Sequence, residues 1–193
     1  MDNSNESRDL NETEQRLALR LARQTLENYF LGKDISVDLS SFPIFRQPRG
    51  VFVTLHKKDT GKLRGCVGQV VAVEPLGEAI KQMTIAAAVD DPRFPPLTYA
   101  ELNQIRIEIS VLSPLRKVNL PDQIELGKHG VLIRQGLKSG VFLPQVAKET
   151  GWDLATFMSR LCTDKAGLEP DAWQNGSAEI YVFTVQTFAE NNS

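Results

Sequence analysis

The stretch Leu63-Arg64-Gly65-Cys66-Val67-Gly68 combines a thiol, a cation and two glycines within a few residues. Cys66 is one of only 2 cysteines in the 193-residue chain. A thiolate is a nucleophile and a redox group, and a neighbouring cation favours its formation. The Arg64 guanidinium carries a fixed charge and a fork of donors that suits a carboxylate or phosphate. We therefore predict a catalytic role for Cys66 and binding of an anionic small-molecule ligand by Arg64.

The two glycines that flank Cys66 predict a close approach of another molecule or of another backbone. Gly65 and Gly68 carry no Cβ atom, so a ligand could lie directly against the main chain. We include both among the expected substrate-binding residues. The structural alternative is that Cys66 is a small buried side chain between two closely packed backbones, as is common for a lone cysteine.

Two further residues could transfer protons. His129 precedes Gly130 at the start of a predicted strand, and it could act as the base that activates Cys66. Alternatively, His129 only forms hydrogen bonds to the backbone of its loop. Glu108 lies on the polar side of a predicted strand, where it could serve as a general acid or base or simply face water. We expect the other histidine, His56, to be an exposed strand residue.

The stretch Asp90-Asp91-Pro92-Arg93 ends a predicted helix, because the residue before a proline is disfavoured in helical geometry. This rigid exit would hold Arg93 in one place. We predict that Asp91 and Arg93 belong to the substrate-binding set together with Arg64. In the structural alternative, Arg93 only pairs with Asp91. The partners open to Arg64 would then be Asp90, Asp91 and Glu108.

The pattern of residues does not support a metal or cofactor site. The 2 cysteines and 2 histidines are scattered without the spacing of zinc ligands. No Walker, dinucleotide-binding or nucleophile-elbow pattern occurs in the sequence. We therefore predict a protein that works without a metal or a cofactor.

The elements that must position these residues follow from hydrophobic periodicity and from turn residues. Helical spacing predicts helices over residues 13–31, 75–90 and 153–166, and a capping box predicts a short helix at residue 98. Alternation predicts strands over residues 50–57, 63–71, 105–112, 131–134, 141–143 and 178–188. The implied hairpins and the irregular order of helices and strands favour an α+β fold, with a mainly antiparallel sheet and flanking helices.

Composition sets the class of protein and its expected location. Hydrophobic residues make up 41% and charged residues 24%, and the net charge of −2 argues against general nucleic-acid binding. No apolar run approaches the roughly 20 residues of a membrane span. The polar start resembles no secretory signal and two cysteines form no disulfide framework, so we expect a cytoplasmic location. We also expect a disordered lead over residues 1–11, followed by a single domain of two subdomains over residues 12–190.

With these segments in view, the chain resembles the AMMECR family, whose prokaryotic members are called AmmeMemoRadiSam system protein A. The resemblance covers about residues 50–188, and the first helix can be included. It rests on several motifs in the right order: Gly50-Val51-Phe52-Val53-Thr54-Leu55, the signature Leu63 to Gly68, Asp91-Pro92-Arg93-Phe94-Pro95-Pro96-Leu97, Ile107-Glu108-Ile109-Ser110-Val111-Leu112-Ser113-Pro114, His129-Gly130, Phe142-Leu143-Pro144-Gln145-Val146 and Gly151-Trp152-Asp153. The signature usually has isoleucine in place of Val67, a change of one methylene group.

The resemblance implies a two-lobe α+β fold in which the signature lines a cleft between the lobes. It also implies two pathway partners, a Memo-like dioxygenase-related protein and a radical-SAM protein. It does not supply a reaction. Three functions therefore stay open: a thiol-dependent enzyme in a modification pathway, a non-catalytic module whose Leu63 to Gly68 stretch shapes a groove for a partner protein, and nucleic-acid binding through the lysines near residues 57–62. The net charge argues against the third.

Overall fold

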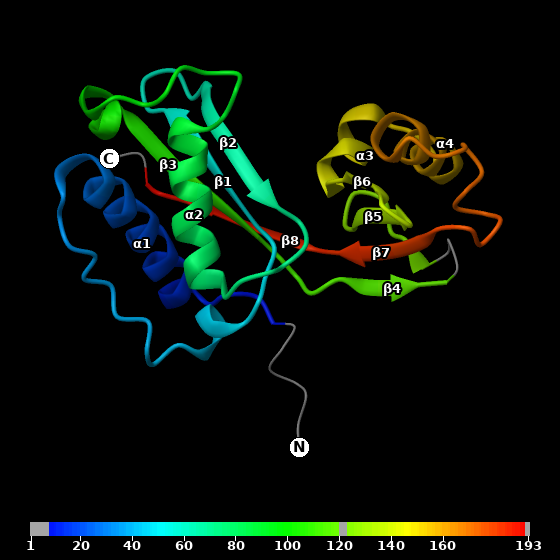
Figure 1. Ribbon diagram of the computed structural model, residues 1–193, viewed down its shortest axis with the longest axis horizontal. Coiled ribbons are helices and arrows are strands. Elements are labelled where there is room, and N and C mark those ends of the chain that lie inside the picture. Colours follow the sequence, from blue (N-terminus) through cyan, green and yellow to red (C-terminus); the bar gives the residue numbers. More distant parts are fainter. Residues whose placement is uncertain (1–7, 120–122, 192–193) are drawn as a thin grey trace. The chain divides into compact units, whose positions relative to one another are not determined.

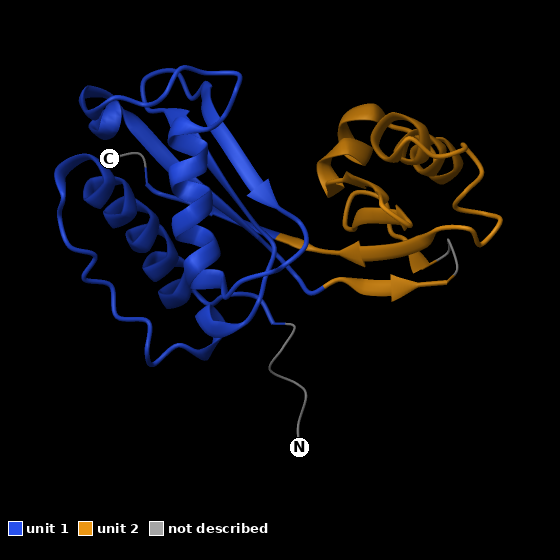
Figure 2. Cartoon of the chain, viewed as in Figure 1, with its two compact units in different colours: residues 1–114, 186–193 blue, residues 115–185 orange. Residues whose placement is uncertain are grey.

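The computed structural model describes residues 8–119 and 123–191, which form two compact units. Unit 1 comprises Met1–Pro114 and Gln186–Ser193, and unit 2 comprises Leu115–Val185 (Figure 2). Each unit has its own sheet and its own group of helices. The predicted α+β class with antiparallel sheets is confirmed.

Unit 1 contains a four-stranded sheet with one face covered by two helices (Figure 1). Its strands are β1 (Val51–Lys57), β2 (Leu63–Gln69), β3 (Ile105–Leu112) and β8 (Val185–Ala189), in the spatial order β2-β1-β3-β8. Its helices are α1 (Glu12–Leu31) and α2 (Leu76–Val89), with short 3₁₀ turns η2 (Pro43–Arg46) and η3 (Tyr99–Gln104). The order of the strands leaves β2 at an edge of the sheet.

Alternation in β1 and in most of β3, whose last residue Leu112 is also buried, separates the two faces of this sheet. Val51, Val53 and Leu55 of β1 are completely buried, whereas the residues between them are half-buried on the opposite face. The odd-numbered residues of β3 are buried in the same way. Side chains alternate across a strand, so the apolar set meets α1 and α2 while the polar set shares the other face. We call this second surface the open face.

Local signals set the ends of α1, and they order part of the chain that we expected to be disordered. Asn11 caps α1 in a reciprocal capping box with Glu14, and Gly32 ends the helix at φ +66°. Leu10 is 3% exposed within the core, and Arg8 pairs with Glu14 at 2.6 Å. Residues 8–11 are thus part of unit 1. The rest of the expected disordered lead, residues 1–7, lies outside the described residues.

Unit 2 has a second antiparallel sheet in the order β4-β7-β5-β6. Its elements are β4 (Arg116–Val118), β5 (Gly130–Gln135), β6 (Lys138–Phe142), α3 (Pro144–Thr150), α4 (Leu154–Arg160), the π-helical turn η5 (Leu161–Ala166) and β7 (Glu179–Phe183). Asp153 caps α4 as predicted, by accepting the Thr156 N–H at 2.8 Å. The predicted strand over residues 178–188 differs from the structure, because it divides at Thr184 into β7 and β8, which join different sheets.

The helices of the described residues give no sign of a membrane-spanning segment. None of those between residues 8 and 191, apart from the undescribed 120–122, is both long and apolar enough to cross a bilayer.

We predict that Gly65→Ala destabilises unit 1 by about 3 kcal/mol, because overpacking against rigid backbone cannot relax. A Cβ atom at this position would lie 2.0 Å from the carbonyl oxygen of Ala87 in α2. Urea unfolding at neutral pH measures the loss. The matched control is Gly61→Ala, where φ is +66° but no atom lies within 4 Å of the new Cβ. That variant should lose only the roughly 1–2 kcal/mol of left-handed strain. Equal losses in the two variants would contradict close packing of α2 on Gly65.

Candidate functional site

Cys66 lies at one end of a polar row that crosses the open face of unit 1. The strand register pairs Cys66 of β2 with Thr54 of β1, and Thr54 with Glu108 of β3. The Thr54 hydroxyl donates a hydrogen bond to Cys66 Sγ over 3.3 Å. A thiol, a hydroxyl and a carboxylate therefore lie side by side on three adjacent strands.

The backbone of Cys66 is held by Asp91, which lies just beyond the end of α2. Asp91 Oδ2 accepts the Cys66 N–H at 2.8 Å, and Arg93 Nη2 donates to the Cys66 carbonyl oxygen at 3.2 Å. Both groups lie on the outer edge of β2, so Asp91 and Arg93 cap an edge strand that would otherwise present free main-chain groups. Because these main-chain groups face away from β1, Cys66 and Thr54 form the closer, non-hydrogen-bonded type of antiparallel pair.

Arg93 joins this edge cap to the thiol. Its Nε and Nη2 donate to the two carboxylate oxygens of Asp91 at 2.9 and 2.7 Å. The pKa of Arg93 is raised, mainly by this hydrogen bonding to Asp91 and additionally by attraction to the Cys66 side chain. In turn the guanidinium holds the pKa of the buried Asp91 carboxyl well below its usual range. The Arg93 side chain is 55% exposed, so this cation faces solvent beside Cys66.

Arg64 has a different environment, with only 5% of its side chain exposed. Its Nε and Nη2 donate to Glu101 at 2.7 and 3.1 Å. This pairing is the main reason why the pKa of Glu101 falls to about 2. The partner is none of the three acids that we considered from the sequence, because η3 brings Glu101 next to the start of β2. Arg64 could meet an anionic ligand only if this buried pair opened.

The two signature glycines allow close packing within unit 1, whereas their predicted role in substrate binding stays a prediction. A Cβ atom on Gly65 would collide with the backbone of α2 at Ala87. A Cβ atom on Gly68 would lie 2.2 Å from the ring of Phe52, which covers that position on the open face. The space that each glycine provides is therefore already filled by atoms of unit 1.

His56 is the histidine that shares the open face with Cys66. Its side chain is 20% exposed, which corrects the expectation of an exposed residue. Nε2 lies 3.7 Å from Glu108 Oε1, and Nδ1 lies 3.2 Å from the carbonyl oxygen of Gly61. The β1–β2 turn and β3 thus fix the ring from two sides.

His129 lies in unit 2, in the turn before β5. The ring Nδ1 of His129 accepts a hydrogen bond from the backbone N–H of Glu125 at 3.0 Å. The backbone N–H of His129 donates to the Glu125 carbonyl oxygen. Burial is the largest cause that lowers its pKa, with smaller contributions from Lys128 and Arg116. These contacts stabilise a local turn. The catalytic role that we predicted for His129 stays a prediction.

Thr54, His56 and Glu101 are the residues near Cys66 that our sequence analysis missed as members of the site. The alternation in β1 does place Thr54 and His56 on one polar face, and this was the available signal. The capping box Thr98 to Glu101 was recognised, but its acid accepts hydrogen bonds from both Thr98 and Arg64. Propensity and capping rules describe neighbours along the chain, so they could not show the second contact.

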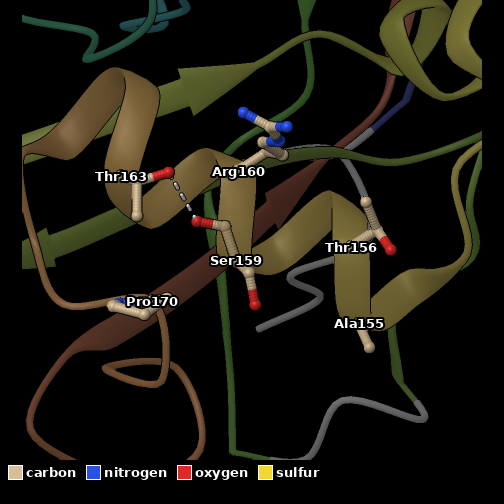
Figure 3. Close-up of a pocket in the computed structure, with 6 residues that line it drawn as sticks. All are labelled: Ala155, Thr156, Ser159, Arg160, Thr163 and Pro170. Carbon is tan, nitrogen blue, oxygen red and sulfur yellow. Dashed lines mark hydrogen bonds between the residues drawn. The ribbon is translucent and has the colours of Figure 1, made fainter.

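Unit 2 contains a pocket of about 410 Å³ along α4 (Figure 3). Its lining consists mostly of small and hydroxyl-bearing side chains: Ala155, Thr156, Ser159, Arg160, Thr163 and Pro170. The Thr163 hydroxyl donates to the Ser159 carbonyl oxygen at 3.1 Å, and Arg160 lies 3.5 Å from Asp164. No residue that we predicted as functional lies there. In the described part of the chain, no group of three or more acidic, histidine or cysteine residues could hold a metal ion.

Comparisons with known proteins agree over most of the chain. The sequence model of the AMMECR1 family matches residues 19–188. A protein of Methanosarcina acetivorans is 45% identical over 192 residues, which are 94% of this chain and 94% of the relative. Protein MJ0810 of Methanocaldococcus jannaschii is 43% identical over 180 residues, 90% of this chain and 88% of that protein. The crystal structure of uncharacterized protein PH0010 from Pyrococcus horikoshii is similar with a TM-score of 0.73, at 38% identity and 90% coverage of both chains.

We predict that Asp91→Asn destabilises the protein by about 2 kcal/mol at pH 7, the scale of a hydrogen bond to a charged group. The folded pKa of Asp91 lies below its ordinary value of 3.8. Its stabilising contribution is therefore complete above about pH 4 and is lost as the pH falls through the lower folded value. Urea unfolding of both proteins from pH 7 downward tests this sign. The two free energies of unfolding should converge in acid, and a constant difference would contradict the charged edge cap.

Proposed function

We propose that this chain, which belongs to the AMMECR1 family, is a thiol-dependent enzyme that acts on a small anionic substrate at the open face of unit 1. The observation that supports the proposal is the surroundings of Cys66. Its sulfur accepts a hydrogen bond from Thr54, and the half-exposed Arg93 guanidinium donates to the carbonyl oxygen of the same residue. Thiols beside such cations are the reactive ones in proteins.

Arg93 is the residue that we propose for anion binding. Its Nε and Nη2 are engaged by Asp91 and by the Cys66 carbonyl, whereas Nη1 makes no hydrogen bond to any described residue. Its guanidinium carbon lies 5.6 Å from the centre of the Phe94 ring, so the ring supports the plane of the cation. A carboxylate or phosphate on Nη1 would place the rest of a small substrate next to Cys66.

The proposed reaction begins with attack of the Cys66 thiolate on an electrophilic carbonyl carbon. A sulfur–carbon bond forms, the π electrons of the C=O bond move to its oxygen, and that oxygen takes up one proton. Arg93 holds the anionic group of the substrate during this step. Glu108, two strands away in the same polar row, is the predicted acid–base residue that lies on this face.

The family resemblance extends the proposal to a pathway. We propose that the enzyme works in a modification pathway with a Memo-like dioxygenase-related protein and a radical-SAM protein. Co-purification of the tagged chain with each partner tests whether they bind physically.

A non-catalytic binding module is the second candidate, and one observation favours it. Apolar side chains are exposed at the start of β2 and just beyond its end, with Leu63 37% and Val71 54% exposed. In this alternative β2 and its flanks form a surface for a partner protein, and Cys66 only contributes to packing. Partner binding that survives Cys66→Ala but is lost in Arg64→Glu would favour the module.

We predict that Cys66 prefers the anionic reagent iodoacetate over the neutral iodoacetamide, relative to free cysteine, by about threefold, since an exposed ion pair contributes about 0.7 kcal/mol. Both reagents transfer nearly the same group, so their rate ratio isolates the charge. Mass spectrometry follows alkylation of Cys66 and Cys162 separately. Cys162 is buried in unit 2 and its pKa is raised by that burial, so it should react slowly with both reagents.

Two arginine variants test where the preference originates. Arg93→Gln should bring the ratio back to that of free cysteine. Arg106→Gln removes the same charge from a neighbouring position of β3 and should keep the preference. If Cys66 reacts no faster than Cys162, the thiol-enzyme proposal is wrong and the binding module is favoured.

A further inference from the structure

A polar pocket of unit 1 lies beside the segment that follows β8. It has a volume of about 390 Å³, which is within the range of pockets that hold small molecules. Its lining residues come from α1, the β1–β2 turn, η3 and the segment after β8. They are Arg23, Lys58, Asn103, Glu190 and Asn191. We call this the Lys58 pocket, and the proposed thiol chemistry does not use it.

An ion pair between Arg23 and Glu190 braces one side of the Lys58 pocket. Arg23 Nε donates to Glu190 Oε1 at 2.9 Å. The Nη1 and Nη2 atoms of Arg23 donate to the carbonyl oxygens of Leu102 and Ile105 at 2.8 and 3.0 Å. Glu190 Oε2 also accepts the Ile107 N–H at 2.9 Å. The two charges compensate each other, and these contacts hold this part of the pocket in place without a ligand.

The other three lining side chains can all donate hydrogen bonds. Lys58 carries an ammonium group, and Asn103 and Asn191 each carry an amide NH₂ group. All three are exposed, and their side chains form no hydrogen bond or ion pair with any residue of 8–119 or 123–191. Two cations and one carboxylate give the lining a net charge of +1. Donors and positive charge together suit an anion.

The type of donor indicates which anion fits the Lys58 pocket. The flat fork of a guanidinium matches a carboxylate, but the fork of Arg23 is already engaged by Glu190. An ammonium group acts as a point charge and commonly binds phosphate. A phosphate monoester carries roughly −1.5 to −2 charges at pH 7, so Lys58 attracts it more strongly than it attracts a carboxylate. Its three acceptor oxygens match three donor side chains on different segments.

We propose that the Lys58 pocket binds the phosphate group of a small phosphate ester through Lys58, Asn103 and Asn191. The rest of the pocket accommodates the organic group that carries the phosphate. This inference goes beyond the proposed thiol enzyme, because neither Cys66 nor Arg93 lines the pocket. Failure of either proposal therefore leaves the other standing.

Titration with glycerol 3-phosphate tests the pocket, followed by NMR of the backbone amides and the Asn side-chain amides. In the wild-type protein we expect saturable shifts at Lys58, Asn103 and Asn191. Lys58→Gln should weaken binding about fivefold, the upper scale of an exposed ion pair. Asn103→Asp replaces a donor by a negative charge of similar size and should weaken binding about tenfold. Shifts that do not saturate in the wild type would overturn the inference.

Lys62→Gln is the matched control for Lys58→Gln. It removes a lysine from the same exposed turn, but Lys62 does not line the pocket, so affinity should stay unchanged. Equal weakening by the two variants would mean only general attraction of an anion to this turn and would contradict a built site. Acetate at the same ionic strength tests the class of ligand. It should bind several-fold more weakly, and equally tight binding of acetate would reject a phosphate site.

Discussion

The hydrogen bond from the backbone N–H of Cys66 to Asp91 is the contact on which the candidate site depends. A buried carboxylate accepts the outward N–H of an edge strand, and Arg93 both neutralises that carboxylate and donates to the outward carbonyl. The outer edge of β2 is therefore capped by side chains that follow α2. The same charges that close the edge place a cation beside the thiol, so the structural and the proposed chemical roles of Arg93 come from one arrangement.

The two faces of the unit 1 sheet have different roles, one in stability and the other in the candidate site. One face supplies the free energy of folding, because the branched side chains of β1 and β3 bury completely against α1 and α2. This firm support lets the other face carry a thiol, a hydroxyl, an imidazole and a carboxylate at fixed register. Gly65 is needed for this arrangement, because only a residue without a Cβ atom allows the backbone of α2 to pack so closely against β2.

The site itself was only partly predictable. Cys66, Asp91, Arg93 and Glu108 were singled out from their chemistry, and the structure places all four in unit 1 around the open face or its edge. The glycines were assigned to a ligand, but their space is filled by Ala87 and by Phe52. In the structural alternative to ligand binding, Arg64 was to pair with Asp90, Asp91 or Glu108, and it pairs with Glu101 instead. His56 was overlooked in favour of His129, since a histidine next to a turn gives no sign of what lies across the sheet.

The sequence by itself determined the α+β class, the helix caps and the two-faced strands, because these depend on residues a few positions apart along the chain. It also identified the family, through motifs that keep their order from Gly50 to Asp153. Only the tertiary structure decided which polar groups meet. Strand register brought Thr54 between Cys66 and Glu108, and the packing of α2 brought Asp91 to the edge of β2. Such contacts join residues far apart in the chain, and one polar side chain can satisfy several partners equally well, so its local sequence does not specify which of them it will find.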